Sequence, residues 1–283
     1  MAKFIPLHIH SEFSLLDGTI RIGDLVNYAK ENELPAIAVT DHGVMYSAIE
    51  FYEKAKEAGI NPLIGCEFYV HDGDIHVHDN SHNPLYHLIL ICKDAKGYAN
   101  LIKLVSTAWC EGFYYKPRIN FELLKEHHEG LICASACLGG EVLQNLLKGD
   151  YAKAKETAQR YKDLFGDDYY IELQDHNLED QKRTNPDLIK IAKELNIKMI
   201  ITNDSHYLRR EDADAQDTLL CLQTNADKDD PNRFHFPNNE FYIKSKEEMR
   251  KAFSWMDDET FEECVKNTED AASKCNVEIE RGN

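Results

Sequence analysis

The stretch FIPLHIHSEFSLLDG, residues 4–18, decides both the fold and the chemistry that this sequence predicts. Residues 4–10 form a short apolar run, as a buried strand does, and the run ends on His8 and His10. Residues two apart on a strand point to the same face, so both imidazoles can reach one metal ion. Asp17 lies in the loop just beyond them.

Further short apolar runs alternate with amphipathic stretches along the chain. Strands are predicted over residues 4–10, 36–40, 63–70, 86–92, 131–136, 169–173 and 198–202. Helices are predicted over residues 22–29, 46–58, 95–109, 141–147, 151–165, 186–195, 213–222 and 260–274, and residues 71–84 are predicted to form a loop. This alternation favours a parallel α/β architecture, and periodicity leaves a closed barrel and an open doubly wound sheet both possible. No G-x-G-x-x-G follows the first strand, which argues against a dinucleotide-binding domain.

Length and composition permit one large barrel or two smaller domains, because the chain has 283 residues and is 43% hydrophobic. Its eight cysteines are scattered without a C-x-x-C pair, and no signal peptide is visible, so reduced thiols and a cytoplasmic location are expected. No run of eighteen apolar residues predicts a membrane span.

The formal net charge of −18 bears on the substrate. A protein that binds DNA through its overall field would be basic. This chain is expected to repel nucleic acid except where bound cations reverse the local sign. A phosphate substrate must therefore be captured by metals or by a local basic patch, or be presented by a partner.

Side chains that bind metals gather at the ends of the predicted strands, where β/α barrels place their active sites. These candidates are His8, His10, Asp17, His42, Glu67, His87, Cys137, Asp204 and His206. Imidazole, carboxylate and thiolate together suit zinc, manganese or iron. Nine donors are too many for one ion, so two to three divalent metal ions are predicted. Clustered cations can clamp a phosphate and deprotonate a water molecule.

Several neighbouring residues have two open interpretations. Asp41 either orients a ligating histidine or caps a loop. Lys116 and Arg118 either contact a substrate phosphate or form an exposed basic turn. The nearby Tyr114 and Tyr115 either stack on a base or pack under their loop.

The sequence also contains a second His-x-His pair, which is not predicted to bind metal. His76 and His78 have the same spacing as His8 and His10, but they lie inside the predicted loop. They are predicted to be solvated. Spacing alone is therefore weak evidence, and the joint pattern at several strand ends carries the prediction.

The segments LHIHSEFSLLDG (7–18), AVTDHG (38–43), GCEFYV (65–70), YHLILIC (86–92) and NDSHYL (203–208) resemble the polymerase and histidinol phosphatase (PHP) domain. More narrowly, AWCEGFYYKPRIN (108–120), EDADAQDTLLCLQT (211–224) and RFHFPNNEFYIKSKEEM (233–249) resemble the N-terminal PHP domain of bacterial DNA polymerase III alpha subunits. The resemblance covers essentially the whole chain. It implies a distorted (β/α)7 barrel, with a core over about residues 1–210, an extension over about residues 211–283 and no polymerase modules.

The resemblance also implies a site with three ions. His8, His10, Glu67 and Asp204 would hold one ion, and Asp17, His42 and His206 a second. Glu67 would bridge to a third ion, held with His87 and Cys137. Asp17 and Cys137 stand where the phosphatase relatives usually carry histidine.

The implied function is hydrolysis of phosphodiesters by a hydroxide that bridges metal ions. In this branch it would serve 3′–5′ exonuclease proofreading of a DNA 3′ end, with polymerase modules or replisome subunits as partners and no membrane. One alternative is a small-molecule phosphatase of the histidinol-phosphatase type. Another is a metal-stabilised, non-catalytic domain that braces the polymerase or binds a partner.

Overall fold

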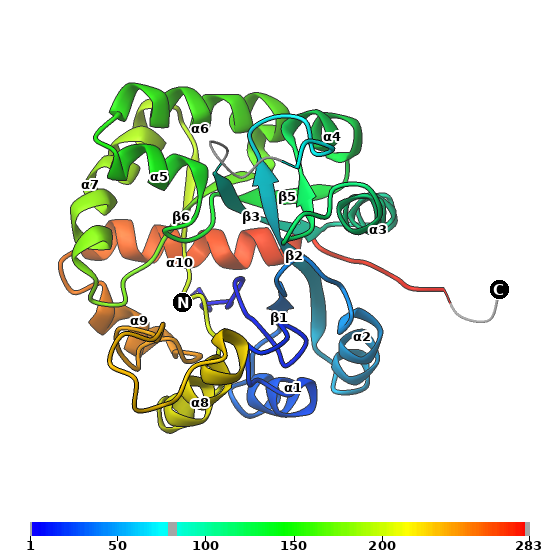
Figure 1. Ribbon diagram of the computed structural model, residues 1–283, viewed down its shortest axis with the longest axis vertical. Helices are drawn as coiled ribbons and strands as arrows, with labels where there is room; N and C mark the ends of the chain where they lie inside the picture. The colour runs from blue at the N-terminus through cyan, green and yellow to red at the C-terminus, as the bar shows by residue number, and fades with distance from the viewer. Residues whose placement is uncertain (1, 79–83, 281–283) are drawn as a thin grey trace.

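The structure is a computed structural model that describes residues 2–78 and 84–280, so part of the predicted loop 71–84 lies outside the described residues. Seven strands form one curled sheet, a mixed α/β arrangement that makes a distorted barrel (Figure 1). The strands are β1 (Ala36–Val39), β2 (Asn61–His71), β3 (Leu85–Cys92), β4 (Arg118–Ile119), β5 (Leu131–Ala134), β6 (Tyr169–Leu173) and β7 (Lys198–Ile201). Their order is β1-β2-β3-β5-β6-β7, and the short β4 pairs with β2.

Helices surround the sheet (Figure 1). They are α1 (Ile22–Glu31), α2 (Ala48–Glu57), α3 (Ala95–Cys110), α4 (Phe121–His127), α5 (Glu141–Leu147), α6 (Tyr151–Phe165), α7 (Glu179–Glu194), α8 (Ala213–Thr224), α9 (Lys246–Ala252) and α10 (Asp258–Ser273). The sequence did not predict α4 and α9, which span only seven residues each. The predicted start of α7 at residue 186 was wrong, because Pro186 lies inside the helix, whose polar first turns carry no apolar periodicity.

One strand departs from the parallel architecture that the sequence favoured. β3 runs antiparallel to both β2 and β5, whereas the other paired strands are parallel. No helix lies between β2 and β3 in the described residues, and parallel neighbours need a long crossover connection, so β3 returns alongside β2. The N-terminal end of β3 therefore lies at the same edge as the C-terminal ends of its neighbours.

Residues 4–10 do not form the regular strand that was predicted, but they occupy its place between β1 and the end of β7. The backbone of this segment bonds to both sides: the Thr40 amide donates to the Ile9 carbonyl at 2.8 Å, and the His10 amide donates to the Ser205 carbonyl at 2.8 Å. A single parallel bridge joins Ile9 and Ser205. The segment thus closes the seam of the barrel without a continuous ladder.

The C-terminal part of the chain contributes to the same core as the barrel. α10 crosses the middle of the molecule in Figure 1, and its Ala271 and Ala272 belong to the buried cluster that contains Ile5, Ala38 and Ile200. The Ile5 amide donates to Thr268 Oγ1 at 3.0 Å. A truncation at residue 210 would therefore remove part of the core.

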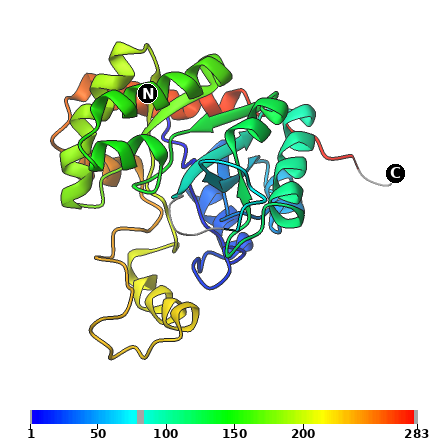
Figure 2. The ribbon, with the colours of Figure 1, turned by 45° about the horizontal axis from the view of Figure 1, so that its top comes forward.

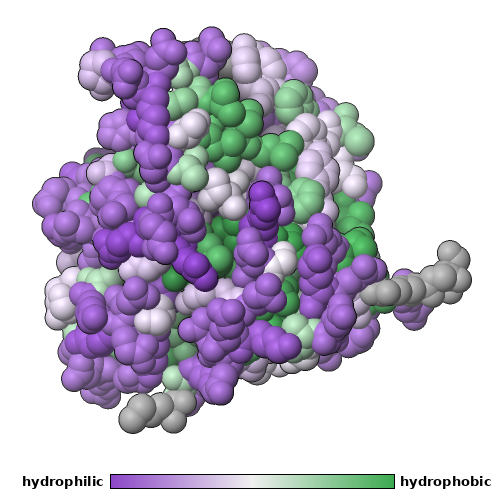
Figure 3. All heavy atoms as spheres, turned by 90° about the horizontal axis from the view of Figure 1, so that it is seen from below, coloured by the Kyte–Doolittle hydropathy of each residue, from purple (hydrophilic) through white to green (hydrophobic). Residues whose placement is uncertain are grey.

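The surface seen from below, towards α1 and α2, is mostly hydrophilic, and hydrophobic areas lie in its upper part and middle (Figure 3). α8 and the loop after it project from the rest of the molecule (Figure 2). Within residues 2–78 and 84–280, no helix is both long and apolar enough to cross a membrane.

Candidate metal centre

Four side chains converge beneath a cavity that one of them, Asp204, lines. Donor atoms of His8, His10, Glu67 and Asp204 all lie within 4.8 Å of one another, and all four residues are buried. The two Nε2 atoms of the histidines are 3.1 Å apart, and each lies 3.1 Å from Asp204 Oδ1. The seam segment, β2 and the loop after β7 thus deliver their donors to one point.

His8 is held from behind by a carboxylate. Its Nδ1 lies 2.6 Å from Glu172 Oε1, and because a carboxylate accepts hydrogen bonds, Nδ1 carries the proton. Gln174 and Thr202 also donate to Glu172, so the carboxylate is itself fixed. This arrangement directs the Nε2 of His8 at the other donors, as in the carboxylate–histidine–metal triads of metalloproteins.

His10 is held through a serine. Ser14 Oγ donates to Asp41 Oδ1 at 2.8 Å, so its oxygen accepts from His10 Nδ1 at 3.1 Å. Asp41 is fully buried and also accepts from Ser11 and Ser47. Asp41 therefore holds the loop after His10 through Ser11 and orients the imidazole of His10 through Ser14.

Asp17, His42 and His206 form a second group of donors. Asp17 Oδ2 lies 2.9 Å from His42 Nε2 and 3.3 Å from His206 Nε2. His206 Nδ1 lies 2.9 Å from the backbone carbonyl of Asp204, so Nδ1 is the donor and Nε2 faces Asp17. The imidazole of His10 contacts both of these rings, with its centroid 4.0 Å from that of His42 and 4.4 Å from that of His206.

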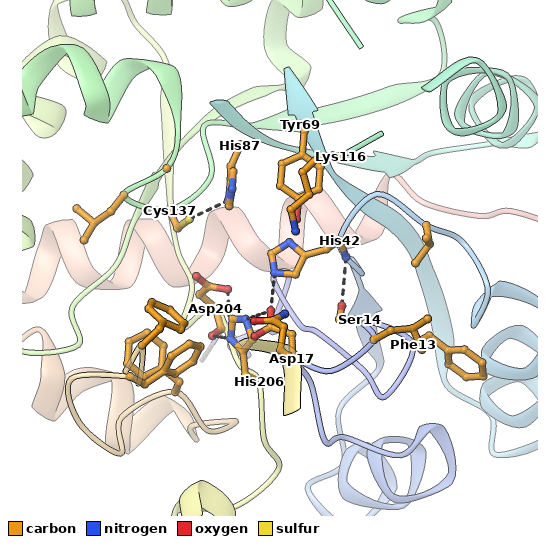
Figure 4. Close-up of a pocket in the computed structure, with 18 of the residues that line it drawn as sticks. Phe13, Ser14, Asp17, His42, Tyr69, His87, Lys116, Cys137, Asp204 and His206 are labelled. Atoms are coloured by element: carbon orange, nitrogen blue, oxygen red, sulfur yellow. Dashed lines mark hydrogen bonds and ion pairs between the residues drawn. The ribbon is translucent and has the colours of Figure 1, made fainter. Parts of the chain in front are cut away.

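Glu67, His87 and Cys137 form a third group. Glu67 Oε1 lies 2.9 Å from His87 Nδ1, and Cys137 Sγ lies 3.5 Å from the same nitrogen (Figure 4). Glu67 Oε2 instead faces His10 and His42, and Oε1 also lies 3.6 Å from His8 Nε2, so all three groups share this carboxylate. Gly139 leaves space for His87, because an added Cβ there would lie 2.9 Å from the ring.

The segment after α8 positions the loop that carries Asp204, whose backbone is left-handed with φ of 43°. The His206 amide donates to the Phe241 carbonyl at 2.8 Å. The side-chain amide of Asn203 donates to the carbonyls of Glu240 and Tyr242, and the buried Lys244 donates to Asn203 Oδ1 at 3.1 Å. These bonds offset the cost of the left-handed conformation.

The donor set fits divalent cations. His42 Nδ1, Glu67 Oε2 and Asp204 Oδ1 are buried and lack a hydrogen-bond partner in the described part of the chain, although they lie close to one another. Burial lowers the pKa of His8, but Asp204, Glu172 and Glu67 outweigh burial and raise that pKa well above its ordinary value. The carboxylates thus demand positive charge, which a bound cation supplies.

A cavity of about 840 Å³ opens above these donors, and Lys116 and Tyr115 line it. Arg118 does not reach the cavity. It is 2% exposed and donates to the backbone carbonyls of Gly112, Val77 and Ile75. Neither of the two interpretations of Arg118 fits, because its guanidinium is buried and joins the loops that carry Ile75, Val77 and Gly112.

The other residues that had two interpretations differ in where their side chains lie. Lys116 lies beside Tyr69, with Nζ 5.1 Å from the ring (Figure 4). Tyr114 packs on His78 with ring centroids 4.8 Å apart, whereas Tyr115 is exposed. His76 is exposed and contacts Asp74, and in the described residues neither His76 nor His78 joins a donor group.

The sequence analysis missed Glu172, Ser14 and Gln174. A signal for Glu172 was available, because it stands inside the apolar strand β6 as Glu67 stands inside β2. A buried carboxylate in a strand needs a partner, and that argument applies to both. Ser14 had no such signal, since a serine in a loop is ordinarily solvated.

The PHP domain family model matches residues 6–176. The chain is 46% identical to the DNA polymerase III subunit alpha of Deinococcus radiodurans, over 99% of this chain and 22% of that protein. It is 45% identical to the same subunit of Borreliella burgdorferi, over 97% and 24%.

The chain therefore spans about a quarter of the length of the curated relatives it matches. Among solved structures, a two-domain protein from Bacteroides vulgatus that contains a predicted PHP-like metal-dependent phosphoesterase is similar. Its TM-score is 0.45 at 18% identity, covering 73% of this chain and 53% of that one.

Proposed function

The chain belongs to the PHP domain family, and from that premise we propose that it hydrolyses phosphodiesters with two to three bound divalent ions, as part of a DNA polymerase III alpha-like protein. The observation that carries this proposal is the convergence of His8, His10, Glu67 and Asp204, with both imidazole Nε2 atoms directed at one point. Without a cation, protonated histidines would have to balance the carboxylates of Glu67 and Asp204, whereas a divalent ion can accept all four donors at once.

We propose the ligands by group. The first ion is held by His8, His10, Glu67 and Asp204, the second by Asp17, His42 and His206, and the third by Glu67, His87 and Cys137. Bound divalent ions would lower the pKa of water and neutralise charge on a phosphoryl group. Zinc, manganese and iron all suit these donors.

The chain's own residues would place the ester. The donor groups lie at the base of the cavity, so a phosphate must enter past its walls. Lys116 supplies a cation on that wall, which complements one phosphate charge. Glu172 and Ser14 hold His8 and His10 in fixed orientations, so these ligands do not have to reorganise during the reaction.

The test is to measure bound metal and hydrolysis together. Metal is counted by plasma mass spectrometry, and hydrolysis is followed on p-nitrophenyl phosphate, its bis ester and a 3′-labelled oligonucleotide with added manganese or zinc. The wild type is expected to bind two to three ions and to cleave the diester substrates. The double variant His8→Ala, Asp204→Ala should lose both properties, while His76→Ala, which changes an exposed histidine, should lose neither.

A second candidate is a metal-stabilised domain without catalysis, and one observation favours it: the similar polymerase subunits are about four times as long as this chain. In that case, metal is bound and raises the melting temperature, but no substrate is cleaved with any metal. Cleavage of the phosphomonoester alone would instead support a small-molecule phosphatase. Cleavage of the oligonucleotide from its 3′ end would support a proofreading exonuclease.

A further inference from the structure

Exposed aromatic side chains surround the mouth of the cavity above the donor groups. Tyr46, Trp109, Phe113, Tyr115 and Phe234 all line the cavity, and each is between 40% and 73% exposed. A phosphate group alone would fill only a small part of a cavity of about 840 Å³. The remaining space is therefore shaped for a larger and mainly apolar portion of a ligand.

Two of these rings form a preorganised surface, which we call the aromatic shelf: Trp109 and Phe113. Their ring centroids are 5.3 Å apart and their planes differ by 15°, so they are nearly parallel. The indole Nε1 of Trp109 donates to the Gly43 carbonyl at 2.8 Å. Gly43 directly follows His42, so the shelf has a fixed position relative to the donor groups.

The charge of the cavity argues against recognition through a phosphate backbone. Histidines aside, Lys116 is the one cationic side chain among the residues that line it in the described part of the chain. The formal net charge of the whole chain is −18. Away from the donor groups, where the ions would bind one phosphate, a ligand would gain little from further phosphates, because backbone binding depends on many basic contacts. A ligand with one phosphate ester and a flat apolar group matches the cavity better.

We propose that the aromatic shelf binds the nucleobase of a nucleotide whose phosphate ester lies over the donor groups. This inference rests on the proposed function, since phosphate-ester binding places the other end of the ligand in the cavity. A base offers a planar face of the size of the indole ring, and aromatic stacking tolerates any base sequence. The site would thus recognise a nucleotide by one base and one phosphate.

The test uses binding as well as activity. The chain has two tryptophans, Trp109 and Trp255, so a Trp255→Phe background makes Trp109 the sole indole fluorophore. In the metal-loaded protein, deoxyadenosine monophosphate is expected to quench Trp109 and to bind about ten-fold more tightly than deoxyribose 5-phosphate, which lacks the base. In the same background, Phe113→Ala should remove that ten-fold advantage and leave sugar-phosphate binding unchanged.

Matched variants keep the result interpretable. Phe113→Tyr should restore nucleotide binding because it restores an aromatic face. Ile102→Ala removes an exposed apolar side chain of α3 that does not line the cavity, so it should have no effect. The shelf is overturned if the two ligands bind equally, if the nucleotide does not bind, or if Phe113→Ala leaves its affinity unchanged.

Separate measurements test base binding by the aromatic shelf and the proposed phosphodiesterase function. Methyl p-nitrophenyl phosphate is a phosphodiester that carries no nucleobase, and the metal-loaded wild type should hydrolyse it. Absence of this hydrolysis would overturn the phosphodiesterase proposal, whereas the two binding affinities judge the shelf independently of turnover.

Discussion

His8 and His10 lie on one side of Glu67 with fully buried rings, and another side chain holds the Nδ1 atom of each. His87 and Cys137 lie on the other side, next to the open cavity, and the His87 side chain is 25% exposed. We call these the braced side and the open side of the site. The contrast indicates that the protein fixes the first pair during folding, whereas a bound ion must draw the second pair into place.

The largest effect is expected from replacing Asp41, which supports His10 on the braced side through Ser14. Asp41→Ala leaves the hydroxyls of Ser11, Ser14 and Ser47 without their buried acceptor. Unsatisfied buried donors and the new cavity should lower the free energy of unfolding by about 3 kcal/mol or more. Urea denaturation of the metal-free protein measures this loss.

Asp229→Ala is the control for that experiment, because Asp229 is exposed. It should change the free energy of unfolding by less than about 0.5 kcal/mol. If Asp41→Ala unfolds at the same urea concentration as this control, the braced side does not owe its rigidity to Asp41.

Removal of bound metal should affect the open side more than the braced side. A ligand at a hundred times its Kd stabilises a protein by about 2.7 kcal/mol, so chelation should lower the Tm by roughly 5 °C or more. Hydrogen exchange should quicken most at residues 137–140 on the open side and least at residues 8–10. Equal acceleration on both sides would show that metal orders the braced side as well.

A smaller effect is expected when the contact between Glu172 and His8 on the braced side is weakened but not removed. Glu172→Gln keeps the size of the side chain but removes the charge that faces His8 Nδ1, so metal affinity should fall about ten-fold. Competition with a chelator of known affinity measures it. Glu141→Gln is the matched control, since Glu141 is also buried but pairs with Arg160. An equal effect of the two variants would contradict a specific role for Glu172.

The smallest effect on stability is expected on the open side. Cys137→Ser should change the free energy of unfolding of the metal-free protein by less than about 0.5 kcal/mol. With cobalt bound, it should abolish the thiolate-to-cobalt charge-transfer absorption that the wild type is expected to show. Cys110→Ser, at an exposed cysteine, should retain that absorption. Persistence of the band in Cys137→Ser would exclude Cys137 as a ligand.

The same contrast explains how much the sequence could predict. The sequence predicted that His8, His10 and Asp204 lie together, and they do, because the ends of strands in a β/α fold meet at one edge. His87 was placed correctly at the start of its strand, but only the antiparallel direction of β3 explains how it reaches that edge. Strand direction depends on the connection and on long-range pairing, which apolar periodicity does not encode.

The supporting residues were harder to predict for a physical reason. The roles of Ser14 and Lys244 come from contacts with Asp41 and Asn203, which the folded chain brings together over 27 and 41 positions. The error at Arg118 has the same origin. A cation beside aromatic residues suits a phosphate site, but its guanidinium is satisfied by backbone carbonyls of two other loops. Composition cannot distinguish these environments.

The hydrogen bond from Ile5 to Thr268 joins residues 263 positions apart, and it has a consequence for synthesis on the ribosome. At typical translation rates of about 5–20 residues per second, the segment that carries His8 and His10 emerges roughly 13 to 50 seconds before α10. Its other partners, in β1 and at Ser205, emerge in between. His8 and His10 are therefore the first of the predicted metal ligands to leave the ribosome and among the last to be fixed in place.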